Sequence, residues 1–279
     1  MENLIYPCLW FNGNALEAAN FYCSVFDNSH IVDQNPVVVN FESSGQKFMC
    51  LNGGPQFTVN PSISFYVVCE TIEEVDKYWK KLTEGGMEMM PLDKYPWSER
   101  YAWVQDRFGI TWQLSFGKMK DVGQKFTPTL MFTKSKAGKA EQAINFYTSV
   151  FQPSSIVGIM RYDPGEGDVE GTVKHAQFRI KEYVLMAMDS SLSHSFEFNE
   201  GISLVVECET QEQIDHYWDR LTEGGSEGQC GWLKDQFGIS WQIVPSVLGQ
   251  LMNNPERSPK VMEAFMKMKK FDINKLLEA

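Results

Sequence analysis

The segment ISFYVVCETIEEVDKYWKKLTEGG at residues 63–86 returns as ISLVVECETQEQIDHYWDRLTEGG at residues 202–225. About 15 of the 24 aligned positions are identical, far above chance for one folded unit. The likeness continues on both sides, in two further pairs of segments: WVQDRFGITWQLSF (103–116) with WLKDQFGISWQIVP (232–245), and PCLWF (7–11) with PTLMF (128–132). The sequence therefore predicts two copies of one domain, and the function has to be explained on a duplicated fold.

The composition fits two ordinary globular cores with an acidic surface. With 279 residues, 43% of them apolar, the chain can bury two cores of roughly 120 residues each. The net charge of -11 and the isoelectric point near 4.9 argue against the basic surface that binding to nucleic acid or to an anionic membrane requires. We therefore expect neither as a partner.

Targeting and cysteine patterns favour the cytoplasm. The N-terminal segment MENLIYPCLW lacks a basic region and a long apolar stretch, and no run approaches the ~18–20 apolar residues of a membrane span. The six cysteines form no CxxC pair, and four lie in the first copy against two in the second. A shared disulfide framework would repeat, so we expect buried free thiols and a reducing, cytoplasmic setting.

Each copy reads as the order βαβββ followed by βαβββ. In the first copy the pattern predicts a strand at 4–11 and a helix capped by Asn14. It predicts a second strand at 63–69 and a helix capped by Thr71, which buries Val75, Trp79 and Leu82. The remaining strands are expected at 30–33, 37–42, 47–51, 87–90, 101–104 and 111–116. The segment PLDKYPWSER (91–100) is expected to be an extra loop, and such loops often carry specificity.

The repeat also predicts the domain bounds. We expect one domain at 1–120, a connector near 117–125, a second domain at 126–250, and a helical tail at 251–279. In the tail, Ser258-Pro259 begins a helix and Asp272 caps the last one.

The doubled βαβββ order resembles the vicinal-oxygen-chelate superfamily, which includes glyoxalase I, extradiol dioxygenases and bleomycin-binding proteins. The likeness is strongest to its PhnB-like group. It rests on P-x-L-x-F in the first strand, NFY-x-SVF in the first helix, D-x-FGI-x-WQ in the last hairpin, and the tail VMEAFMKMKKFDINKLLEA. The resemblance implies an α+β fold whose modules curl into cups around a pocket. The tandem copies would form an intrachain pseudo-dimer, with the C-terminal helices free to support a further homodimer.

The same resemblance implies a divalent metal held by four side chains from the first and last strands of the modules. Proline, alanine, serine and glutamine are poor or impossible ligands for Zn²⁺ or Fe²⁺. We therefore expect no metal or other cofactor. The matching positions are Pro7, Cys50, Ser64 and Gln113 in the first copy and Pro128, Ala187, Ser203 and Gln242 in the second.

Some proteins of this group carry the label 3-demethylubiquinone methyltransferase. The sequence gives that label no support, because it has no strand, glycine-rich loop and helix that would cradle an adenosyl cofactor.

Strand alternation predicts which side chains line the two cups. Thr111 and Ser115 are in phase with Gln113, and Ser240 is in phase with Gln242. Apolar lining is expected from Leu9, Phe48, Tyr66, Leu130, Leu185 and Val205. The predicted ligand-binding residues are Gln113, Gln242, Thr111, Ser240, Ser64, Ser203, Cys50, Phe11 and Phe132.

An apolar cup with a few polar groups suits a small, partly aromatic ligand, so a small-molecule-binding protein is the first hypothesis. In a plainer interpretation, these side chains simply fill the cup. A second hypothesis is a metal-dependent enzyme of glyoxalase or dioxygenase type, with a non-standard site built from Cys50, Gln113 and His175. In a third, only the first copy binds.

Two further kinds of residue have competing interpretations. His175 is the one histidine suited to proton chemistry, although a structural role is favoured because no carboxylate or nucleophile is visibly paired with it. Asp106 and Asp235 precede Phe-Gly and are expected to fix hairpins in which Gly109 and Gly238 take positive φ.

Overall fold

A computed structural model of the protein describes residues 4–279 and confirms the βαβββ order, twice in each copy. The first copy holds β1 (Ile5–Phe11), α1 (Ala15–Val25), β2 (Ser29–Gln34), β3 (Val38–Ser43), β4 (Gln46–Asn52), β5 (Ile63–Cys69), α2 (Ile72–Leu82), β6 (Met87–Tyr95), β7 (Ser98–Gln105) and β8 (Thr111–Phe116). A short helix, α3 (Met119–Val122), follows it.

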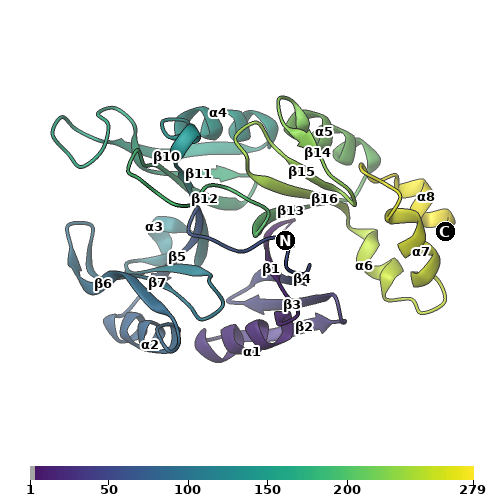
Figure 1. Ribbon diagram of the computed structural model, residues 1–279, viewed down its shortest axis with the longest axis horizontal. Coiled ribbons are helices and arrows are strands. Elements are labelled where there is room, and N and C mark those ends of the chain that lie inside the picture. Colours follow the sequence, from purple (N-terminus) through teal and green to yellow (C-terminus); the bar gives the residue numbers. More distant parts are fainter. Residues whose placement is uncertain (1–3) are drawn as a thin grey trace. The chain divides into compact units, whose positions relative to one another are not determined.

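The second copy repeats this order and is followed by three helices, shown in yellow-green and yellow in Figure 1. It holds β9 (Phe126–Phe132), the 3₁₀ turn η1 (Lys134–Lys136), α4 (Ala140–Val150), β10 (Ser154–Arg161), β11 (Val173–Ile180), β12 (Tyr183–Asp189), β13 (Ile202–Cys208), α5 (Gln211–Thr222), β14 (Ser226–Glu227), β15 (Trp232–Lys234) and β16 (Ser240–Pro245). The tail helices are α6 (Val247–Met252), α7 (Ser258–Phe265) and α8 (Ile273–Glu278).

The described chain divides into two compact units. The central unit is Leu9–Ile202, and the tail unit consists of Ser203–Ala279 together with the residues up to Cys8. Strand β1 contributes its first residues to the tail unit and its last to the central unit. The bounds predicted from the repeat (1–120, 126–250 and 251–279) describe units of sequence and stay a prediction.

The central unit contains an eight-stranded sheet to which both copies contribute. Its strand order is β10-β11-β12-β9-β5-β8-β7-β6. Strands β5–β8 come from the first copy and β9–β12 from the second, and the two sets meet where β5 runs antiparallel to β9. In the same unit β2 pairs with β3 and β3 with β4, while the tail unit has the order β14-β15-β16-β13.

Helix starts follow the cap chemistry in most places. The Thr71 side chain accepts a hydrogen bond from the backbone N–H of Glu74 at the start of α2, and Thr210 does the same for α5. The predicted cap of α1 is wrong in its acceptor. Asn14 occupies the N-cap position but its side chain accepts no hydrogen bond, and Asn52 Oδ1 accepts from the Ala15 N–H instead, at 2.9 Å.

The D-x-FGI hairpins form as predicted. Asp106 accepts hydrogen bonds from the N–H groups of Phe108 (2.8 Å) and Ile110 (3.1 Å) and from Trp112 Nε1 (2.8 Å). Asp235 repeats the arrangement at the same three distances. Gly109 and Gly238 take φ of 90° and 93°, which glycine adopts without strain. Each hairpin therefore fixes the register of the strands that flank it.

The extra loop predicted at 91–100 is instead mostly strand. Strands β6 and β7 extend to a two-residue turn at Pro96-Trp97 and form a long hairpin at the edge of the sheet. Pro91 is tolerated within β6 because an edge strand leaves one row of N–H groups unpaired, and the register is irregular on both sides of it.

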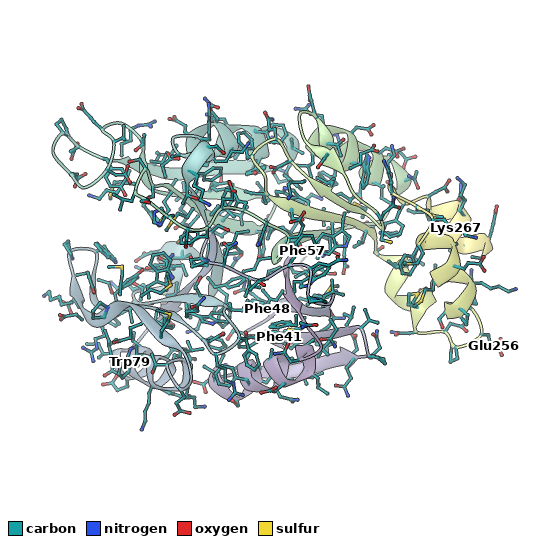
Figure 2. The ribbon with its side chains drawn as sticks, in the orientation of Figure 1. Phe41, Phe48, Phe57, Trp79, Glu256 and Lys267 are labelled. Atoms are coloured by element: carbon teal, nitrogen blue, oxygen red, sulfur yellow. The ribbon has the colours of Figure 1, made fainter. Side chains whose placement is uncertain are left out.

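Aromatic side chains fill the layer between the sheets and the helices of the central unit. Figure 2 shows Phe41 and Phe48 lying together, and their rings stack at 4.8 Å between centroids. Trp112 is fully buried against Phe26 and Tyr22 of the α1 region. The prediction for Trp79 is wrong in part: it is half-exposed and donates to Glu88, while Tyr78 takes the buried position on α2. Among residues 4–279, no helix is both long and apolar enough to cross a membrane.

Candidate ligand-binding site

One face of the central sheet carries a polar row that crosses four strands. Thr127 on β9 pairs with Tyr66 on β5, Tyr66 pairs with Gln113 on β8, and Gln113 pairs with Trp103 on β7. Residues paired across neighbouring strands point to the same side of a sheet, so these four side chains share one face. We call it the Gln113 face. Thr111, two residues before Gln113 on β8, lies on it too.

A chain of hydrogen bonds fixes the amide of Gln113. The Tyr101 hydroxyl donates to Gln113 Oε1 at 3.0 Å, and Gln113 Nε2 donates to Ser64 Oγ at 2.7 Å. All three side chains are buried, and burial raises the pKa of Tyr101 far above its ordinary value. Tyr101 therefore remains a neutral donor, and the Ser64 hydroxyl keeps a hydrogen to offer to another group.

Four buried polar atoms on this face have no hydrogen-bond partner: Trp103 Nε1, Thr111 Oγ1, Ser115 Oγ and Thr127 Oγ1. Leaving such an atom unsatisfied costs about 1–3 kcal/mol, so native proteins rarely gather several of them without a purpose. The indole nitrogen can only donate, whereas the three hydroxyls can donate or accept. Together they form a set of polar groups that a bound molecule could satisfy.

The connector between the copies fills one end of the Gln113 face. Val122 of α3 packs with Val68, Val184 and Met186, and Met119 and Tyr66 lie against this cluster. The Gln124 side chain extends this packing: its Nε2 donates to the Val184 carbonyl and its Oε1 accepts from the Val184 N–H. This end is apolar and closed, so the polar row lies beside a packed wall.

Aromatic rings gather at the β6–β7 turn. Trp97 stacks on Tyr95 with 5.0 Å between ring centroids and 26° between planes. Both rings meet Tyr101 edge-on, at 5.4 Å for Tyr95 and 5.5 Å for Trp97. Because the Tyr101 hydroxyl also bonds to Gln113, these aromatic residues connect the protein surface to the buried polar row.

The tail unit carries a reduced counterpart around Gln242. Gln242 Nε2 donates to Ser203 Oγ at 2.9 Å, and Gln242 pairs with Val205, where the central unit has Tyr66. Burial raises the pKa of the neighbouring Cys8 thiol to about 12, although Gln242 and Ser203 oppose the shift through hydrogen bonds. Cys8 is therefore a neutral, unreactive thiol. Ser240 is buried beside Ser203, its register partner.

The structure brings Gln113, Ser64 and Thr111 together, and Gln242, Ser203 and Ser240 likewise. It also places Tyr66 and Val205 on the predicted faces. For three other predicted residues the face is wrong. The Phe11 ring packs against Phe108, and the Phe132 ring packs against Phe198. Cys50 lies near Tyr22 of α1. All three therefore belong to the aromatic layer between the sheets and the helices. The same correction applies to Leu130, Leu185, Pro128 and Ala187, which are out of phase with the polar row of the central sheet. It also applies to Phe48, whose ring packs against Phe41 and Phe65.

His175 lies far from the polar row. It is on β11, and β12, β9 and β5 stand between that strand and β8. At ~4.8 Å per strand this places Gln113 roughly 19 Å away along the sheet. Burial lowers the pKa of His175, so the ring is neutral at neutral pH. The set Cys50, Gln113 and His175 is therefore not assembled into one site.

The Gln113 face does not fit the divalent metal that the superfamily implies. Its donors are one amide, which is already bonded at both ends, together with serine, threonine and tyrosine hydroxyls. Such groups are weak ligands for Zn²⁺ or Fe²⁺ compared with imidazole, thiolate and carboxylate. Within residues 4–279, no three His, Cys, Asp or Glu side chains lie close enough together to hold a metal.

Sequence reasoning missed Tyr101, Trp103 and Thr127. For two of them the sequence held a usable signal, because the predicted D-x-FGI hairpin fixes which residues of its two strands face each other. Counting back from that turn places Trp103 opposite Gln113 and Tyr101 opposite Ser115. Thr127 carried no comparable signal, because its position depends on the pairing of β9 with β5.

Comparison with known proteins agrees with this architecture. A family model described as 3-demethylubiquinone-9 3-methyltransferase matches the chain twice, over residues 3–115 and 124–244. None of the curated proteins matches. A solved PhnB protein of Bacillus cereus is 39% identical over 40% of this chain and 98% of its own length, with a TM-score of 0.38. A Staphylococcus aureus protein is 29% identical over 42% of this chain and 99% of its own, with a TM-score of 0.20.

A longer match shows the fold across both copies. Glyoxalase I from Zea mays covers 88% of this chain and 94% of its own length, with a TM-score of 0.57 and 12% identity. The order of elements, the two family-model matches and the Bacillus cereus relative agree with one another. The chain thus belongs to the PhnB-like family described as 3-demethylubiquinone-9 3-methyltransferase, and carries two tandem copies of its domain in a glyoxalase-type fold.

Proposed function

We propose that the protein binds a small molecule on the Gln113 face of the central unit, without a metal ion. The observation that carries this proposal is the set of four buried, unpartnered polar atoms on that face, Trp103 Nε1, Thr111 Oγ1, Ser115 Oγ and Thr127 Oγ1. A ligand with hydrogen-bonding groups at matching positions would satisfy these atoms and recover the free energy that their burial costs.

The surroundings support binding more than catalysis. The polar row holds no carboxylate or imidazole that could act as a general base, and three strands separate the one candidate histidine, on β11, from β8. The preformed Tyr101–Gln113–Ser64 chain holds its side chains in one arrangement, which lowers the ordering cost when a ligand binds. We therefore favour a binding or sequestering role over the metal-dependent enzyme.

The names of the relatives do not change this proposal. The family description names a methyltransferase, but the Gln113 face has no helix N-terminus with a glycine-rich loop to hold an adenosyl cofactor. Glyoxalase I from Zea mays is too distant in sequence, at 12% identity, to carry over its activity.

The test is a titration of the full chain with Nile red, an uncharged dye whose fluorescence rises in an apolar site. We expect saturable binding of one dye per chain that survives EDTA. Gln113→Leu and Trp103→Phe should weaken it about tenfold, which corresponds to one lost hydrogen bond. Gln242→Leu in the tail unit is the matched control and should leave it unchanged.

Three outcomes contradict the proposal. They are the absence of saturable binding, equal loss in Gln113→Leu and Gln242→Leu, and binding that appears only after Zn²⁺ or Fe²⁺ is added. The melting temperature of each variant is measured alongside, so that a folding defect is not mistaken for a lost contact.

A further inference from the structure

The β6–β7 hairpin carries the only aromatic residue among the large, strongly exposed apolar side chains of residues 4–279. Trp97 is 57% exposed at the turn, although its neighbours Tyr95 and Tyr101 hold it by ring contacts. An exposed tryptophan that is ordered by its neighbours offers a flat apolar face at little entropic cost. In the second copy the corresponding strands are only Ser226–Glu227 and Trp232–Lys234, so this feature belongs to the first copy alone.

The hairpin is anchored on two sides. Ser98 Oγ lies 3.0 Å from the Phe116 carbonyl at the end of β8, within hydrogen-bond distance. Arg100 Nε donates to Asp76 Oδ1 on α2 at 2.7 Å. The position of Trp97 relative to the Gln113 face is thus set before any ligand arrives, and this preorganisation favours a ligand of defined shape.

The Gln113 face beneath the hairpin is uncharged. Its members on β5, β7, β8 and β9 are hydroxyl, amide, phenol and indole side chains, and burial raises the pKa of both Tyr66 and Tyr101 so that they stay neutral. At the turn itself, Lys94 and Glu99 lie 3.8 Å apart and offset each other's charge. An anionic ligand would give up its hydration here without meeting an opposite charge, and Asp93, the exposed register partner of Tyr101 on β6, would repel it.

We infer that the hairpin selects the ligand, and that the ligand is a neutral molecule with a planar aromatic or conjugated ring and at least one oxygen acceptor. The ring lies against Trp97 and Tyr95, and the oxygen points inward to Trp103 Nε1, whose hydrogen has no acceptor in the protein. This inference rests on the proposed function. It adds the chemical class of the ligand and identifies Trp97 as the residue that distinguishes a planar ring from a non-planar one.

The test uses three probes of the same size at pH 7. 2-Naphthol is planar and neutral, decahydro-2-naphthol is neutral but not planar, and naphthalene-2-sulfonate is planar but charged. By isothermal titration calorimetry on the full chain, we expect 2-naphthol to bind about tenfold tighter than either analogue, as one aromatic contact and one avoided charge burial would give.

Trp97→Ala should remove the preference for 2-naphthol over decahydro-2-naphthol, and Trp97→Phe should restore part of it. Met87→Ala is the matched control, because Met87 lies on the same hairpin with the same 57% exposure, and it should keep the preference. Both positions are exposed, so the variants should fold, and their melting temperatures check this.

The inference is overturned if 2-naphthol does not bind, if the sulfonate binds equally well, or if Trp97→Ala keeps the preference for the planar ring. Gln113→Leu separates this failure from that of the proposed function. If Gln113→Leu weakens all three probes while Trp97→Ala changes no preference, the site stands and the hairpin is not its selector. If Gln113→Leu changes nothing, the site itself is wrong.

Discussion

The regions around Gln113 and Gln242 began as the same structure and now differ in what surrounds a shared amide. Both glutamines donate to a serine on the neighbouring strand, at 2.7 Å and 2.9 Å. The neighbours of Gln113 are Tyr66, Tyr101 and Trp103, and the Trp103 indole N–H has no acceptor. Gln242 instead pairs with Val205 and has Cys8 beside it. The hairpin and the bond between glutamine and serine are present in both copies, while the longer polar row is present only in the central unit.

The edges of the two regions differ as well. In the central unit the long strand β6 pairs along β7, whereas in the tail unit β14 has only two residues. There the C-terminal tail takes over: the N–H groups of Cys230 and Gly231 donate to the carbonyls of Met268 and Lys269, both at 2.8 Å. One edge presents an aromatic hairpin, and the other is covered by the tail of the chain. This contrast favours the central unit as the binding site.

The largest effect should come from the feature that the two regions share. Asp106→Ala and Asp235→Ala each leave two N–H groups and an indole N–H without an acceptor. We expect each to lower the free energy of unfolding by about 3–5 kcal/mol, as for other buried charged networks that lose one partner. Urea unfolding followed by tryptophan fluorescence measures both losses, and a difference of more than 2 kcal/mol between them would show that the hairpins are not equivalent.

A second experiment tests the edge covered by the tail. Gly231 has φ of 80°, and a Cβ there would lie 2.5 Å from the Phe271 ring. Its counterpart next to Trp103 is Ala102, which needs no such space. Gly231→Ala should cost about 2 kcal/mol and loosen the tail, because backbone strain and the clash act together. Limited proteolysis followed by mass spectrometry should show faster cleavage after residue 250, and unchanged cleavage would mean that the tail is held elsewhere.

A third experiment makes the central site resemble its counterpart. Tyr66→Val copies Val205 and removes a hydroxyl and a ring from the polar row. Nile red affinity should fall about threefold to tenfold, in line with the loss of one partly buried aromatic contact. The reverse change, Val205→Tyr, serves as the control and should leave the affinity unchanged. Equal effects of the two substitutions would mean that both units bind the dye.

The smallest effect concerns pH. Burial lowers the pKa of His175, whereas the first copy has Val38 at the matching place on β3. His175 therefore takes up a proton more readily in the unfolded chain than in the folded one. The free energy of unfolding has its full value above the pKa of the unfolded state, about 6.5, and falls as the pH drops through the lower pKa of the folded state. His175→Val should remove this loss between pH 7 and pH 5. Thermal unfolding of both proteins across that range measures it, and parallel pH curves would contradict the stated cause.

The order of elements, the D-x-FGI hairpins and the resemblance were all available from the sequence, because they depend on local patterns that occur twice. The orientation of some strands was not. Every residue of β9 is buried, so burial does not tell its two faces apart, and only the alternating Thr127 and Thr129 mark one of them. Choosing Pro128 rather than Thr129 as the inward residue moved Leu130 and Phe132 to the wrong side.

The pairing of the two copies was out of reach for another reason. Nothing in the segments 63–69 and 126–132 specifies that they lie antiparallel in one sheet, since this contact joins residues distant in sequence. Tyr101, Trp103 and Thr127 belong to one site only because the sheet brings β7, β8, β5 and β9 together. The candidate site could therefore be predicted strand by strand but not as a whole.

The β5–β9 junction also limits how this duplication can evolve. If either copy were deleted, the remaining half of the central sheet would expose a long apolar strand, Ile63–Cys69 or Phe126–Phe132, with its hydrogen-bonding edge bare. Such an edge invites aggregation. The two copies are free to diverge in their side chains, as the Gln113 and Gln242 regions have done, while each depends on the other to cover the edge of its strand at this junction.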